Sequence, residues 1–248
     1  MLALLGAVAG LILGSFIAAL TARWPQGRSI AAGRSRCDHC DAVLAPRDLV
    51  PVLSHLVLRG RCRHCGGRIA PRHMAVEIAA AVIGAVALAV HPDMAGVAGA
   101  VFGWMLLALL VLDIEHMWLP DALTLPLLAL GLVVGFWLPP VLGDRAIGAV
   151  AGYASLALIA LGYKAVTGRV GMGGGDPKLF GAIGAWLGWV ALPFVLLLAA
   201  MLGLALVGYD RLAGRAVTRH SRVALGALLA AAAWVLWLAG PLLGSGGS

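Results

Sequence analysis

Long apolar runs fill most of this chain, and short polar turns separate them. Eight runs are nearly continuous in apolar residues: 2–20, 75–90, 97–113, 120–138, 146–163, 178–192, 193–209 and 223–240. A helix needs about 20 such residues to cross roughly 30 Å of hydrocarbon. The pattern therefore predicts an all-α polytopic membrane protein with about eight transmembrane helices. Between the sixth and seventh of these helices we expect a tight turn at Pro193.

Composition supports the membrane interpretation. Of the 248 residues, 62% are hydrophobic and 12% are charged, whereas a soluble domain has about 45–50% apolar and about 25% charged residues. No Lys or Arg precedes the first run. We therefore do not expect a cleaved signal peptide, which would carry a basic leading region. The final residues, 243–248, are expected to form a flexible tail.

The distribution of basic residues predicts an orientation. The segments 21–74, 164–178 and 210–222 contain 17 of the 18 Lys and Arg residues, and only Arg145 falls in a turn on the opposite side. Cytoplasmic loops carry the excess of basic residues, so these three segments are expected to be cytoplasmic. The net charge of +7 then predicts contact with anionic membrane lipids. Nucleic acid is not an expected partner, because no basic stripe with interleaved aromatic residues is present.

One large polar segment, 21–74, separates the first helix, 1–20, from the rest of the membrane region, 75–242. It holds all four cysteines, in two C-x-x-C pairs 21 residues apart: Cys37, Cys40, Cys62 and Cys65. Four thiolates form a tetrahedral set that zinc prefers, and such a closed set makes the zinc structural. Two disulfides or four free thiols are the alternatives, and the cytoplasmic placement disfavours disulfides. We predict a zinc-binding loop domain stabilised by its metal, with His39 and His64 solvated.

Most acidic residues have an ordinary structural interpretation. We expect Asp38, Asp41 and Asp48 to be solvated in the polar loop, and Asp93 and Asp144 to lie in short turns on the opposite side.

Two further acids are more ambiguous. Asp121 follows Pro120 and is predicted to be the N-cap of the next helix, where its carboxylate would accept free N–H groups. Glu77, at the start of the second run, is a candidate for pairing with Arg72 or His73, or for a functional role.

Asp113 has no such structural explanation, because it ends an unbroken apolar run. An ionisable residue at that depth is a functional candidate, and Asp176, in "GMGGGDPKLF", is the natural partner at the same face of the membrane. Two neighbouring carboxylates share a proton, so one can activate water while the other protonates a leaving amine. This arrangement predicts an aspartic protease. Proton or ion transport is the alternative, disfavoured because both acids lie at one membrane edge, and a noncatalytic assembly factor is a more remote one.

Several motifs, in order along residues 10–200, resemble one family. They are "LGSFIAALTARWP", the paired C-x-x-C loop with "LVPVLSHLVLRGRC", "LDIEHMWLPDALTLPLL" and "GMGGGDPKLFGAIGAWLGW". Together they are similar to the bacterial prepilin peptidases, the type IV leader peptidases with a GxGD signature. The resemblance implies an endopeptidase of the bacterial inner membrane that cuts the basic leader from type IV prepilins or type II secretion pseudopilins at the cytoplasmic face. Its catalytic aspartates fall on Asp113 and Asp176.

The resemblance also implies a second activity, methylation of the new N-terminus with S-adenosylmethionine, linked to the zinc-bearing region. The chain departs from the family pattern at Gly174 and Pro177, where aromatic residues are usual, and at Ala18, where Asn is usual. The usual Gly-Pro before the last run is replaced by "RVALGALLAAA". Methylation is therefore less firmly implied than cleavage, and a peptidase without methyltransferase activity is the alternative.

The glycines around Asp176 predict a close approach of substrate. Gly173, Gly174 and Gly175 carry no side chains, so a peptide strand can come near their backbone. Pro177 is expected in the first turn of the following helix. Lys178 is expected either to reach the lipid headgroups or to orient Asp176.

Overall fold

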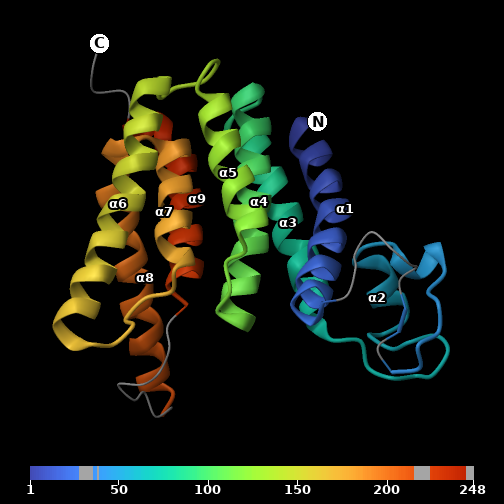
Figure 1. Ribbon diagram of the computed structural model, residues 1–248. Coiled ribbons are helices and arrows are strands. Elements are labelled where there is room, and N and C mark those ends of the chain that lie inside the picture. Colours follow the sequence, from blue (N-terminus) through green and yellow to red (C-terminus); the bar gives the residue numbers. More distant parts are fainter. Residues whose placement is uncertain (28–35, 38, 215–223, 244–248) are drawn as a thin grey trace. The chain divides into compact units, whose positions relative to one another are not determined.

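The computed structural model describes residues 1–27, 36–37, 39–214 and 224–243, and this part of the chain is helical apart from turns and two isolated β-bridges (Figure 1). The all-α class predicted from the sequence is thereby confirmed. The predicted tail, 243–248, lies outside the described residues except for Leu243. The helices are α1 (Leu2–Arg23), α2 (Leu53–Val57), α3 (Pro71–Val90), α4 (Met94–His116), α5 (Asp121–Val134), α6 (Leu142–Thr167), α7 (Gly175–Leu187), α8 (Leu192–Leu212) and α9 (Leu225–Leu243).

Each predicted apolar run coincides with one helix, of which α5 and α7 have only 14 and 13 residues, and α2 is the additional short helix of the polar loop. Five helical segments in the described part of the chain are long and apolar enough to cross a membrane: Leu2–Gln26, Pro71–Val90, Met94–His116, Leu142–Thr167 and Trp189–Leu212. Two shorter apolar helices are α5 and the 225–240 part of α9. The chain forms two compact units, Met1–Ala108 and Leu109–Ser248, which divide within α4.

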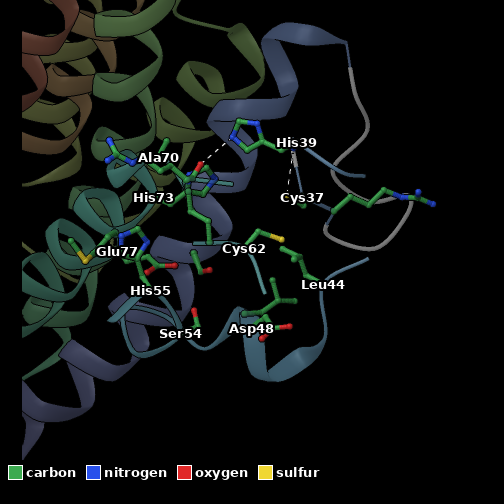
Figure 2. Close-up of a pocket in the computed structure, with 16 residues that line it drawn as sticks. Cys37, His39, Leu44, Asp48, Ser54, His55, Cys62, Ala70, His73 and Glu77 are labelled. Carbon is green, nitrogen blue, oxygen red and sulfur yellow. Dashed lines mark hydrogen bonds between the residues drawn. The ribbon is translucent and has the colours of Figure 1, made fainter. Parts of the chain in front are cut away.

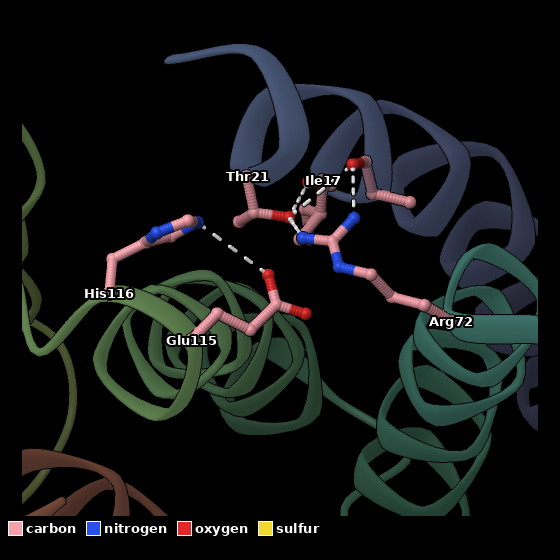
Figure 3. Close-up of polar contacts among 6 residues, drawn as sticks. Ile17, Thr21, Arg72, Glu115 and His116 are labelled. Atoms are coloured by element: carbon pink, nitrogen blue, oxygen red, sulfur yellow. Dashed lines mark hydrogen bonds and ion pairs between the residues drawn. The ribbon is translucent and has the colours of Figure 1, made fainter. Parts of the chain in front are cut away.

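Helices α1 and α3 pack closely in the first unit because small residues face each other. A Cβ on Gly6 would collide with the carbonyl of Gly84, and one on Gly10 would collide with that of Ala80. Small residues allow such close backbone approach between membrane helices. At the end of α1, Arg72 of α3 donates from Nη2 to Thr21 Oγ1 at 2.6 Å and from Nη1 to the Ala18 carbonyl at 3.0 Å (Figure 3).

Helix boundaries in the structure correct two expectations. The break between α7 and α8 lies at Gly188, whose φ of 76° favours glycine, and Pro193 stands within the first turn of α8 rather than at the turn itself. Asp121 is the first residue of α5 and makes no capping hydrogen bond, since Pro120 occupies the cap position. It is Asp93 that accepts hydrogen bonds from the N–H groups of Ala95 and Gly96, at 2.9 and 3.3 Å, at the start of α4.

Arg145 lies in the first turn of α6 rather than in a turn between helices, and it is only 2% exposed. Its guanidinium donates to five backbone carbonyls, at 2.8 to 3.3 Å, from the ends of three neighbouring segments: Gly131, Leu138, Pro139, Pro140 and Ala185. One cation thus satisfies carbonyl groups that helix ends leave without partners. Arg145 therefore joins the ends of α5 and α7 to α6.

Replacement of Arg145 by Met is expected to destabilise the second unit. The change would leave several buried carbonyls without donors, and each such loss is worth about 1–3 kcal/mol. The thermal midpoint in detergent should fall by about 10 °C or more. Lys164→Met, which removes an exposed cation at the other end of the same helix, is the matched control and should leave the midpoint nearly unchanged. An equal midpoint for the two variants would contradict the role of Arg145.

Candidate active site and metal centre

Two acids from distant parts of the chain meet at one end of the second unit. Asp113 lies in the last turns of α4 and is 4% exposed, and Asp176 is the second residue of α7 and is 8% exposed. The carboxylates are close enough for the charge of Asp113 to act on Asp176. The structure therefore brings together the two residues that the sequence analysis paired.

The start of α9 completes this site, and the sequence analysis missed it. The backbone N–H of Ala227 donates to Asp113 Oδ2 at 2.8 Å. The backbone N–H of Gly226 also donates to the carboxylates of Asp113 and Asp176. The first N–H groups of a helix have no partner inside the helix, and the helix dipole favours negative charge there. The sequence feature that could have indicated this part of the site is the pair Gly226 and Ala227 near the start of the last apolar run.

Gly226 has no room for a side chain. A Cβ there would lie 2.7 Å from Leu119 Cδ1 and 2.9 Å from Asp113 Oδ2. Either the leucine or the carboxylate would have to move. Glycine at this position therefore allows the N-terminus of α9 to contact the acid directly.

The three glycines before Asp176 differ in their surroundings. A Cβ on Gly175 would lie 2.7 Å from Leu119 Cβ, and one on Gly173 would lie 3.2 Å from Asp176 Oδ2, whereas Gly174 has open space around it. Gly175 and Gly173 are thus close to Leu119 and Asp176 of the protein itself, whereas the space beside Gly174 is available to another chain. Pro177 lies in the first turn of α7, as predicted.

Lys178 pairs with Asp121, which corrects both the predicted cap and the predicted orientation of Asp176 by this lysine. Its Nζ donates to the two carboxylate oxygens of Asp121 at 2.7 and 2.8 Å. Both side chains are partly exposed, so the pair contributes at most about 1 kcal/mol to stability. The contact joins the first turns of α5 and α7.

The four cysteines form a compact group in the first unit. The sulfur atoms of Cys37, Cys40, Cys62 and Cys65 all lie within 4.8 Å of one another, and none is in a disulfide. The group is of the size and donor type that hold a tetrahedral metal ion. The described histidines are not part of it: His39 contacts the carbonyl oxygen of Arg68 through Nε2 at 3.1 Å, and His64 is exposed.

The two C-x-x-C segments have the same backbone hydrogen bonds. The N–H of Cys37 donates to the Ala42 carbonyl and that of Cys62 to the Gly67 carbonyl, at 3.0 and 2.8 Å. Four residues after each first cysteine the backbone turns to positive φ, at Asp41 (55°) and at Gly66 (69°). The second segment makes this turn with a glycine directly after Cys65, while the first segment makes the same turn with an aspartate.

Backbone donors also act on one thiol of this group. The N–H groups of Cys65 and His64 lower the pKa of Cys62 to about 6. A thiolate is the form that ligates a metal. The local fold therefore favours the thiolate at Cys62, whereas burial and hydrogen bonds with the other three thiols raise the pKa of Cys40.

Asp48 is not solvated, contrary to the prediction, whereas Asp41 is exposed and Asp38 lies outside the described residues. The Asp48 side chain is 3% exposed and accepts a hydrogen bond from Arg63 Nε at 2.9 Å. This hydrogen bond and the charge of Arg63 lower the pKa of Asp48.

Glu77 is also buried, at 7% exposure, and its Oε2 accepts the Val52 N–H at 2.8 Å. Glu77 and Asp48 line the same pocket (Figure 2).

Comparison with known proteins agrees with the order of these parts. Residues 8–91 match the family described as the bacterial peptidase A24 N-terminal domain, and residues 100–208 match the type IV leader peptidase family. The first match contains the four cysteines, and the second contains both acids.

Two relatives that share one name match most of the chain. A prepilin leader peptidase/N-methyltransferase of Aeromonas hydrophila is 43% identical over 210 residues, which is 82% of this chain and 71% of the relative. One of Pseudomonas putida is 37% identical and covers 94% of this chain and 90% of its own length. No solved structure matches the chain.

Proposed function

Because this chain belongs to the type IV leader peptidase family, we propose that it is a membrane-embedded aspartic endopeptidase. It removes the basic leader from type IV prepilins or type II secretion pseudopilins and then methylates the new N-terminus. The observation that carries the peptidase activity is the meeting of Asp113 and Asp176, two buried acids from separate helices, at one end of the second unit.

The chemistry follows from two carboxyl groups in one buried site. One carboxylate takes a proton from water, and the resulting hydroxide adds to the scissile carbonyl. The protonated partner stabilises the oxygen of the tetrahedral intermediate and then donates a proton to the leaving amine as the C–N bond breaks. The amide groups at the start of α9 hold Asp113 in a fixed orientation during these steps.

The surroundings of the acid pair support cleavage at the cytoplasmic face of the inner membrane. Four basic residues lie near the helix ends at which the acids are found: Lys164 in the last turn of α6, Arg169 in the connection to α7, Lys178 in the first turn of α7 and Arg211 in the last turn of α8. Cytoplasmic segments carry such basic residues. In this proposal the extended substrate passes beside the loop of Gly173, Gly174 and Gly175, with the open space at Gly174 admitting its backbone and Lys178 flanking the entry.

We further propose that the cysteine group holds one structural zinc ion. Four sulfur donors within 4.8 Å fit a tetrahedral S4 site, and a thiol with a lowered pKa is already suited to ligation. The metal would link the two C-x-x-C segments of a loop that has few buried apolar residues of its own. The loop domain, 21–74, and the membrane domain, 75–242, then divide the protein into a metal-stabilised part and a peptidase part.

Metal analysis checks the zinc proposal. The purified protein should contain one zinc per chain, and Cys62→Ser should lose most of it because a hydroxyl is a poor zinc ligand. His64→Gln, which changes an exposed residue beside the same cysteines, should retain the metal. Absence of zinc from the unaltered protein, or its full retention by Cys62→Ser, would refute the S4 site.

Mass spectrometry of a prepilin substrate tests the whole proposal. The purified protein in lipid vesicles should convert a prepilin to a product that lacks its leader. With S-adenosylmethionine present, which supplies an electrophilic methyl group, the product should gain about 14 Da at its N-terminus. Cleavage without the added mass would leave a peptidase alone. Absence of cleavage, together with a proton flux that depends on Asp113, would favour the transport alternative.

A further inference from the structure

A cavity of about 220 Å³ lies in the first unit beside the cysteine group, and Cys37 and Cys62 are among its lining residues. Its walls come from the metal-binding loop, from α1 at Ser15 and from the first turns of α3 (Figure 2). The peptidase chemistry makes no use of this cavity. Its lining includes charged side chains from the loop and from α3 as well as apolar ones.

The buried part of the cavity carries two carboxylates. Glu77 is 7% exposed and receives one hydrogen bond, from the Val52 N–H to Oε2. The Asp48 side chain is 3% exposed; its Oδ1 accepts from Arg63, but its Oδ2 is buried without a hydrogen-bond partner among the described residues. A buried carboxylate oxygen that has no donor is costly. The free oxygen can accept an N–H group of a positively charged ligand, and the imidazoles of His55 and His73 line the same cavity.

The rim of the same cavity has the opposite charge. Arg36 and Arg68 line the cavity, and both residues are exposed. Arg36 donates to the Asp41 side chain at 3.2 Å, and Arg68 is the second arginine of the lining. A guanidinium is well suited to bind a carboxylate. Buried carboxylates with guanidinium groups at the rim match an amino-acid zwitterion, which has an α-ammonium and an α-carboxylate on one carbon.

We propose that this cavity binds the amino-acid end of S-adenosylmethionine, with the α-ammonium at Glu77 and Asp48 and the α-carboxylate at Arg68. This inference rests on the proposed methyltransferase activity. The volume supports it, since complete ligand sites usually measure about 300–1,000 Å³, so this cavity suits one end of the molecule and leaves the nucleoside outside. A peptide N-terminus offers an ammonium but no free α-carboxylate, and would use only half of the lining.

Binding of S-adenosylhomocysteine to the zinc-loaded full-length protein in detergent, measured by calorimetry, tests the proposal. This compound is what S-adenosylmethionine becomes after methyl transfer, and it keeps the amino-acid end. Glu77→Gln keeps the shape of the side chain and its acceptor for Val52, yet removes the charge, so it should weaken binding by about tenfold to a hundredfold. Arg68→Gln should weaken binding by about twofold to fivefold, because its partner is solvated.

Two controls isolate the amino-acid end. Methylthioadenosine, which lacks it, should bind weakly and equally to the unaltered protein and to Glu77→Gln. Arg61→Gln removes an equally exposed cation that forms a β-bridge with Arg68 but does not line the cavity, and it should leave binding unchanged. Zinc content verifies that each variant is folded.

Three results would overturn the inference. Unchanged affinity of both Glu77→Gln and Arg68→Gln for S-adenosylhomocysteine would do so, as would equal binding of this compound and methylthioadenosine by the unaltered protein. A third is loss of affinity in Glu77→Gln only for a peptide with a free N-terminal amine. Prepilin cleavage is scored separately and should persist in Glu77→Gln, so failure of the proposed peptidase function would be recognised in the unaltered protein.

Discussion

Replacement of Asp113 or Asp176 by Asn is expected to reduce prepilin cleavage by about 10²–10⁴-fold or more. Asn has nearly the same shape as Asp, but it can neither accept nor release the proton that peptide hydrolysis requires. Each variant also leaves the other acid without its partner, so neither residue compensates for the other. The measurement is the rate of leader removal by the purified protein in lipid vesicles, followed on gels.

The matched control is Asp144→Asn. Asp144 belongs to the same unit and accepts a hydrogen bond from Trp189 Nε1 at 3.1 Å, which the Asn carbonyl can still accept. Cleavage by this variant should stay near that of the unaltered protein. Normal cleavage by either Asp113→Asn or Asp176→Asn would remove the acid pair from the mechanism, provided that the thermal midpoints agree.

The second large effect is expected at Gly226, a residue that has no reactive group. Gly226→Ala would place a Cβ within 2.9 Å of Asp113 Oδ2 and 2.7 Å of Leu119 Cδ1, so the carboxylate or the start of α9 must shift. A displacement of about 1 Å in an active site can reduce the rate by about 10²-fold. We therefore expect cleavage to fall by about tenfold to a hundredfold, mainly in kcat, because Gly226 aligns the acid.

Gly240→Ala provides the comparison on the same helix. No atom lies within 4 Å of a Cβ built at Gly240, and alanine is the better helix former, so this variant should cleave normally. A lowered thermal midpoint in Gly226→Ala with unchanged kcat would show that the glycine serves only packing. A changed pH–rate profile in Gly226→Ala would support its action through Asp113.

Asp113 and Asp176 could be paired from the sequence because each lies at the edge of a long apolar segment. An acid at such a place can be identified as a candidate without any structure. The spacing of the cysteines identifies them as candidate metal ligands in the same way. The errors at Asp121 and Asp48 have one cause. Each side chain has a partner far along the chain or across the loop, at Lys178 for Asp121 and at Arg63 for Asp48, and local pattern holds no information about such pairs.

Arg145 illustrates the same limit inside the membrane region. Its position between two apolar runs is typical of a polar turn, yet five carbonyl groups surround it in the fold. These acceptors belong to the backbone, so no side-chain pattern marks them. Gly226 was missed for a related reason, because a glycine in an apolar run has many possible uses.

The sequence by itself determined the helical class, the eight apolar segments, the cysteine group and the identity of the two acids. Hydrophobic length, ligand spacing and the rarity of charge in lipid are local properties, and each can be evaluated along the chain. Only the tertiary structure decided that α9 donates to Asp113, that Arg145 joins three helix ends, and that two buried carboxylates share a cavity with two guanidinium groups. These are contacts between segments up to 114 residues apart, and they exist only once packing has brought backbone groups together.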